Sequence, residues 1–163
     1  EAVDLQELTS LYSSQFEIGN APVSLHGRDY ISKNTSKEIF EDLFRIYEFF
    51  GLDFKDNNLQ LWPDNLLVEL EFMQYLIYLQ SNSQGSKSSF ILAQRDFIER
   101  HLQPFVQGLC QLINDNGLST YSVISTELLN FILNDLKHLQ QLIEEESLEQ
   151  ESQAFESAEQ GEL

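Results

Sequence analysis

The sequence predicts an all-α fold, a single-domain bundle of five to six helices. Apolar residues recur at spacings of three and four along most of the chain, whereas the alternation typical of strands is hard to find. Only 3 Pro and 7 Gly are present to interrupt these patterns. Hydrophobic residues make up 42% of the 163 positions, which is enough apolar surface for one packed core.

The first two helices follow from apolar spacing and from capping residues. Residues 3–18 place their apolar side chains on one stripe: Leu5, Leu8, Leu11, Tyr12 and Phe16. A polar connection then leads to a second helix, which is expected to begin with Thr35 or Ser36 as its cap and to stop at Gly51. Its apolar face repeats at three and four: Ile39, Phe40, Leu43, Phe44, Tyr47 and Phe50.

The third helix, expected over residues 63–80, is the most apolar part of the chain. Pro63 is suited to the entry of a helix, and apolar side chains then cover nearly the whole circumference. A helix that is apolar on all sides, yet too short and too charged to span a membrane, is expected at the centre of a bundle.

The second half of the chain predicts two further helical stretches and a tail. A polar loop over residues 81–89 precedes a helix over 90–116 with a break at Pro104, and a final amphipathic helix runs from 121 to about 145. We therefore divide the chain into a helical domain, residues 1–143, and an acidic C-terminal tail, residues 144–163. We expect the tail to extend the last helix by a turn or two and then to be mobile.

The charge balance excludes several classes of partner. The chain has 27 Asp and Glu against 9 Lys and Arg, a formal net charge of −18, and eight of the acidic residues lie in the tail. Such a surface repels phosphate backbones and anionic headgroups, which argues against nucleic acid and direct membrane binding. No stretch is long enough to span a bilayer, and neither end has the pattern of a secretion signal. The single cysteine, Cys110, fits a reducing compartment and a packing role.

The sequence shows no constellation for catalysis. The histidines His26, His101 and His138 are scattered, with no cysteine beside them. Asp135 and His138 form one half-motif at most, because a di-metal carboxylate bundle needs two Glu-x-x-His pairs and two further Glu. Phosphate-binding loops and nucleophile motifs are absent. We therefore expect no enzymatic activity, no metal and no cofactor.

The stretch from Leu61 to Met73 is the most informative. Glu69 and Glu71 lie about 200° apart on the predicted helix, so they cannot share one solvent-facing stripe. One carboxylate is expected to line a groove or to be buried and paired, with Arg45, Arg95 or Arg100 as its partner.

Two residues at the start of this stretch have alternative interpretations. Asp64 either contributes to a binding site or caps the helix. Trp62, beside Pro63, is either a core plug or an exposed aromatic anchor for a peptide.

On these residues the chain resembles the TorD/NarJ family of redox-enzyme maturation chaperones, also called the molybdoenzyme delta-subunit family. The central match is Pro63-Asp64-Asn65-Leu66 followed by Glu69-Leu70-Glu71-Phe72-Met73, where the family usually has His in place of Asn65. A Tyr-x-x-Phe-Gly-Leu element matches residues 47–52, and a Phe-x-x-x-His-Leu stretch matches residues 97–102. Together these matches cover roughly residues 22–115.

The resemblance implies a cytoplasmic, cofactor-free chaperone dedicated to a molybdenum enzyme of the dimethyl-sulfoxide-reductase type. Such chaperones hold the catalytic subunit, often by its N-terminal twin-arginine leader, until the molybdopterin cofactor is inserted and export or docking follows. The Glu-Leu-Glu-Phe-Met form is most similar to chaperones of nitrate, selenate, chlorate, dimethyl sulfide or ethylbenzene-type oxidoreductases. The family includes monomers and helix-swapped dimers, and the loop at 81–89 is the expected hinge.

A leader of this kind has a basic segment followed by an apolar helix-forming stretch, so its binder needs an apolar groove with acidic groups at the rim. We expect this site to comprise Tyr47, Phe50, Trp62, Pro63, Asp64, Asn65, Glu69, Glu71, Phe72 and His101. Two other classes stay open: an all-α oligomeric adaptor with a self-complementary apolar face, and a carboxylate-metal or nucleotide hydrolase.

Overall fold

The structure is a computed structural model that describes residues 5–17, 21–31, 35–53 and 61–160, with only the backbone for 153–160. Within these ranges it contains six α-helices and no strand, which confirms the predicted all-α fold. A 3₁₀ turn, η1 (Gly27–Asp29), precedes the second helix, and a π-helical turn, η2 (Ile98–Leu102), joins the fourth to the fifth. The helices are α1 (Leu5–Phe16), α2 (Ser36–Phe49), α3 (Leu66–Asn82), α4 (Ser88–Phe97), α5 (Gln103–Asp115) and α6 (Ser119–Gln160).

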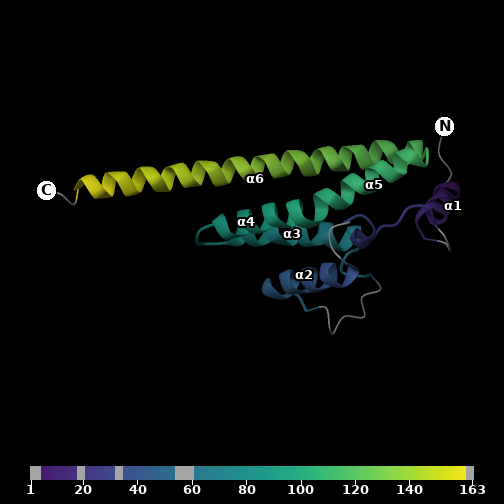
Figure 1. The fold of residues 1–163 in the computed structure, drawn as a ribbon, viewed down its shortest axis with the longest axis horizontal. Helices are drawn as coiled ribbons and strands as arrows, with labels where there is room; N and C mark the ends of the chain where they lie inside the picture. The colour runs from purple at the N-terminus through teal and green to yellow at the C-terminus, as the bar shows by residue number, and fades with distance from the viewer. Residues whose placement is uncertain (1–4, 18–20, 32–34, 54–60, 161–163) are drawn as a thin grey trace.

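The helices are arranged around α4 and α5, which pack along α6 (Figure 1). On the side away from α6, α4 packs against α3, and α2 covers the outer side of this pair. Three buried rings tie α2, α3 and α4 together: the Tyr47 centroid is 4.7 Å from Phe72, which is 4.8 Å from Phe97. The short α1 lies near the corner between α5 and α6, where Phe16 meets Tyr121 edge to face at 4.8 Å.

The start and stop of α2 agree with the prediction. Thr35 is the N-cap, and it forms a capping box in which its hydroxyl accepts from the Glu38 N–H while the Glu38 carboxylate accepts from the Thr35 N–H. Gly51 follows the helix with φ of 81°, a conformation that glycine adopts without strain.

The predicted start of α3 was wrong by one turn. The helix begins at Leu66, and Pro63 lies in the preceding turn, closed by the Asn65 N–H bonded to the Trp62 carbonyl at 3.0 Å. Asn65 is the N-cap, and its side-chain oxygen accepts from the Leu67 N–H at 3.0 Å. A capping residue two positions after the proline therefore determines where the helix starts.

The expected break at Pro104 takes the form of the π-helical turn η2. Proline has no N–H for the regular helical bond, and the wider turn just before it carries the Gln103 N–H to the Ile98 carbonyl. The second stop signal also holds, because Gly117 has φ of 67° after α5.

The last helix is longer than predicted. It was expected to end within a turn or two after residue 145, yet α6 runs to Gln160, and its C-terminal end extends past the rest of the bundle in Figure 1. The stretch after 145 contains Glu, Gln, Ala and Leu, with no Gly before 161 and no Pro, so intrinsic helix propensity outweighs repulsion between like charges. The division at residue 143 and the mobility of the tail stay predictions.

In the described part of the chain, the core forms two apolar clusters. The larger joins α2, α3, α4, η2 and α6, and the smaller surrounds Val23, Phe105, Leu109 and Ile113. Cys110 is buried, as its apolar neighbours predicted. Across the described ranges, no helix combines the length and the apolar character that a membrane crossing requires.

Candidate functional site

The turn before α3 is joined to residues 21–31 by two backbone hydrogen bonds. The Leu66 N–H donates to the Leu25 carbonyl at 3.0 Å, and the Gly27 N–H donates to the Asp64 carbonyl at 2.8 Å. The segment Val23–Ile31, which we call the loop, therefore lies against the first turn of α3.

Asp64 is fully buried where the loop meets the turn before α3. Its carboxylate accepts from the backbone N–H of Arg28 at 3.1 Å, lies 3.5 Å from the Arg28 Nε, and lies 3.3 Å from the Nδ1 of His26. Asp64 is not the helix cap, since Asn65 has that role. The Asp64 carboxylate is satisfied by the loop, which identifies it as a residue that positions the loop against α3.

Glu69 is the buried carboxylate that the spacing of Glu69 and Glu71 predicted. Its side chain has no exposed surface, and in the described part of the chain neither carboxylate oxygen has a hydrogen-bond partner. Desolvation by burial raises its pKa well above the ordinary range, and the nearby charge of Asp64 raises it further. This environment therefore favours the protonated, neutral form of the carboxyl group.

The expected arginine partner of Glu69 was wrong. Arg45 and Arg100 both pair with Asp42, and Arg95 pairs with its neighbour Asp96. Asp42 on α2 and Asp96 on α4 hold these guanidinium groups at the surface, where they stay hydrated. Burying one of them beside Glu69 would cost free energy because its hydration would be lost.

Three other predicted site residues make contacts within the bundle. Tyr47 is buried, and its hydroxyl donates to the Pro63 carbonyl at 2.9 Å. His101 is also buried, with its Nε2 at 3.0 Å from the Asp42 carboxylate, and burial lowers its pKa despite that neighbour. Phe50 caps α2 and packs its ring against Phe72 at 5.8 Å.

Trp62 is an exposed aromatic residue and not a core plug. It is 57% exposed, its ring stacks on Phe40 at 5.7 Å, and the Arg28 guanidinium lies 5.2 Å from its centroid. The guanidinium is also 5.1 Å from the Phe40 ring, so the same arginine joins this pair to Asp64.

The apolar circumference of α3 divides into three faces. One face, with Glu69, Met73 and Leu76, points into the core. The other two faces line two grooves. The α1–α3 groove, about 660 Å³, is lined by Tyr12, Phe16, Glu17, Ala21, Val23, Ser24, Leu25, His26, Leu61, Asn65, Leu66, Leu67 and Leu70. The α2–α3 groove, about 330 Å³, is lined by Tyr47, Gly51, Leu52, Asp53, Val68, Glu71, Phe72 and Tyr75.

The expectation that α3 is central to the bundle therefore needs correction. Leu67 is 53% exposed and Ile77 is 45% exposed, and Tyr78 also reaches solvent. Helices α4 and α2 cover only part of the circumference, so the remaining apolar side chains border the grooves or solvent. An all-round apolar pattern cannot distinguish burial in a core from exposure in a groove.

The α1–α3 groove has the more unpartnered apolar surface. None of the described residues of α1 is buried, and its stripe stays exposed through Leu5, Leu8, Leu11 and Tyr12. Of the predicted binding residues only Asn65 lines this groove. The stripe on residues 5–16 was the one sequence signal for it, but the sequence does not show that the bundle leaves the stripe uncovered.

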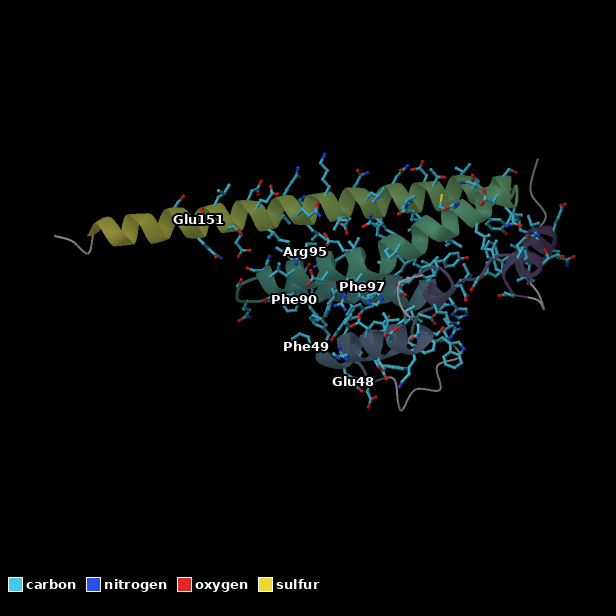
Figure 2. The ribbon with its side chains drawn as sticks, in the orientation of Figure 1. Glu48, Phe49, Phe90, Arg95, Phe97 and Glu151 are labelled. Atoms are coloured by element: carbon cyan, nitrogen blue, oxygen red, sulfur yellow. The ribbon has the colours of Figure 1, made fainter. Side chains whose placement is uncertain are left out.

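The α2–α3 groove brings together three predicted residues, Tyr47, Glu71 and Phe72. The two grooves also share an electrostatic property, since carboxylates but no Lys or Arg occur among their described lining residues. A third hollow of about 240 Å³ between α2 and α4 differs, because Arg45 and Arg100 line it. Figure 2 shows Phe49 and Phe97 in that region.

The described residues contain no group of three or more His, Cys, Asp or Glu able to hold a metal ion.

Comparison with known proteins shows similarity to one family and to several assembly chaperones. The family model described as the nitrate reductase delta subunit matches residues 1–111. The chain is 33% identical over 107 residues to the selenate reductase assembly chaperone protein of Thauera selenatis, covering 62% of this chain and 54% of that protein.

Two further relatives have similar names. The chain is 32% identical over 105 residues to the perchlorate reductase assembly chaperone protein of Dechloromonas aromatica (strain RCB), covering 60% of this chain and 45% of that one. It is 31% identical over 107 residues to the chlorate reductase assembly chaperone protein of Ideonella dechloratans, covering 62% and 54%. The chain thus spans about half the length of the relatives it matches.

Proposed function

We propose that the chain, which belongs to the nitrate reductase delta subunit family, is an assembly chaperone for a molybdopterin-containing oxidoreductase. In this role it binds the catalytic subunit, or the N-terminal leader of that subunit, in the cytoplasm until the cofactor is inserted and export or docking follows. The role is one of binding, with no catalysis and no resident cofactor. The names of three relatives, assembly chaperones of selenate, perchlorate and chlorate reductases, support it.

The observation that carries the proposal is the α1–α3 groove. Its lining is mostly apolar, its described residues include Glu17 but no Lys or Arg, and the exposed stripe of α1 borders it. A leader with a basic segment and an apolar helical stretch would place its apolar face on Leu66, Leu67 and Leu70. The strongly negative chain would attract the basic segment and raise the rate of encounter.

The experiment uses synthetic leader peptides from the catalytic subunits of selenate and chlorate reductases. Binding to the full chain is measured by fluorescence anisotropy for the wild type and for Leu67→Lys. Leu67 is already half-exposed, so the variant should fold, and loss of its apolar contact together with charge repulsion should raise Kd roughly tenfold.

The matched control is Ile77→Lys. Ile77 lies on the same helix, has similar exposure and lines neither groove, so this variant should bind like the wild type. Equal loss in both variants would mean a general charge effect. A selective loss in Glu71→Lys would instead place the peptide in the α2–α3 groove.

One observation favours the alternative of an oligomeric adaptor. The solvent face of α6 exposes Val123, Ile124 and Phe131, apolar residues that a self-complementary interface could cover. The adaptor would self-associate and show no affinity for the leader peptides. A helix-swapped dimer of the chaperone would have its hinge between α3 and α4, at residues 83–87.

A further inference from the structure

Glu69 lies directly beneath the loop. A Cβ atom placed on Gly27 would lie 3.1 Å from the Glu69 Oε1 and 3.4 Å from the Phe105 ring, so the loop backbone closes over the carboxyl group. Glu69 and Phe105 are both fully buried, so this contact excludes water from the carboxyl group.

Among the residues that the structure describes, no group around Glu69 is free to compensate a negative charge there. Asp64, from the turn before α3, would repel it. The hydroxyl of Tyr47, from α2, already donates to Pro63, and its own pKa is raised by burial, so it stays neutral. The two loop groups able to carry a positive charge, Arg28 and His26, both contact Asp64. The other two titratable groups of the loop, Asp29 and Tyr30, both bond to Ser24.

We propose that Glu69 and the loop form a pH-dependent latch: the loop lies closed on α3 while the Glu69 carboxyl is protonated, and it detaches when the proton is lost to solvent. A carboxylate formed in the closed state would be buried without a partner, which is costly. Detachment of the loop lets water reach the carboxylate and frees Arg28 to approach it.

The latch governs one wall of the α1–α3 groove. Val23, Ser24, Leu25 and His26 belong to the loop and line the groove, so detachment would widen or dismantle it. The inference does not depend on what the groove binds, because it concerns the position of the loop in the chain alone.

The direction of the pH dependence follows from the raised pKa of Glu69 in the closed state. The closed state binds this proton more tightly than the open state, in which the carboxyl is hydrated. Between the two pKa values, the opening equilibrium constant rises about tenfold for each pH unit. The loop is therefore closed in acid and opens as the pH increases.

Amide hydrogen exchange of the full chain measures this opening. The reporting amides are those of Gly27, Arg28 and Leu66, which join the loop to the turn and α3. In the wild type, their protection factors, corrected for intrinsic exchange at each pH, should fall by up to about tenfold per pH unit as the pH rises above the ordinary pKa of a glutamate. In Glu69→Gln, which cannot ionise, they should stay constant.

Three further variants keep the test decisive. Glu71→Gln removes an exposed carboxylate two positions away, so its protection factors should fall with pH as in the wild type. Protection factors in Glu69→Leu should not change with pH, so this variant replaces Glu69→Gln if the amide is not tolerated. His26→Asn should keep the pH dependence of the wild type. A flat wild-type profile, an unchanged slope in the Glu69 variants, or a slope that is lost only in His26→Asn would each overturn the latch.

Discussion

Gly27→Ala tests the close approach between the loop and α3. The added methyl group would meet the Glu69 Oε1 at 3.1 Å, the Phe105 Cδ1 at 3.4 Å and the Ile31 Cδ1 at 3.6 Å. The first two side chains are fully buried, so they cannot swing away and the loop must shift. Overpacking of this kind costs about 1–3 kcal/mol, and the lower entropy of the unfolded alanine chain returns about 0.4–1 kcal/mol.

We therefore expect Gly27→Ala to lower the free energy of unfolding by about 1–2 kcal/mol. The measurement is urea unfolding followed by circular dichroism at acidic pH, where Glu69 is protonated and the latch is closed. Gly85→Ala is the matched control, since nothing lies within 4 Å of its Cβ position and its φ is not positive; it should change stability by less than about 0.5 kcal/mol.

A double-mutant cycle identifies the atom responsible. In a Glu69→Ala background the 3.1 Å contact is gone, so the cost of Gly27→Ala should fall by at least about 0.5 kcal/mol. If Gly27→Ala matched Gly85→Ala in stability, or had the same cost in both backgrounds, the packing of the loop on Glu69 would be refuted.

Three other predictions concern stability and are read from chemical unfolding. Tyr47→Phe leaves the Pro63 carbonyl without its donor in a buried site and should cost about 1–2 kcal/mol, whereas an unchanged midpoint would show that the hydrogen bond is not formed. Asn65→Ala removes the cap of α3 and should lower the free energy of unfolding by about 1 kcal/mol. Asn65→Asp can still cap the helix and should keep most of that free energy, so equal losses in the two variants would argue against capping. The lowered pKa of His101 means that the unfolded chain binds its proton more readily, so stability should be lost as the pH falls below about 6.5. This acid limb should shrink in His101→Gln, and an identical limb would contradict the assignment.

Helix ends and helix faces could be predicted from the sequence where they depend on neighbouring residues. The cap at Thr35 and the stop at Gly51 each depend on residues adjacent to the helix end, and both were confirmed. The burial of one carboxylate on α3 followed from helix geometry, and Glu69 is the buried one. The last helix was expected to end too early, because charge repulsion was given more weight than propensity.

The candidate site was less predictable because it depends on how distant segments meet. No spacing rule shows that Asp42 holds Arg45 and Arg100 and leaves Glu69 without a partner. Nor does any rule show that α1 leaves its apolar stripe uncovered beside α3. The predicted binding residues instead divide among a buried junction, the α2–α3 groove and the surface at Trp62.

The central claim is that the chain binds the catalytic subunit of a molybdopterin oxidoreductase. The most direct measurement is purification of the tagged chain from the cells that encode it, with mass spectrometry of the proteins that accompany it. The account predicts a large molybdopterin-binding subunit with the wild type and with Ile77→Lys, and its loss with Leu67→Lys. Recovery of only further copies of the chain, or of an unrelated complex, would contradict the account and favour the adaptor.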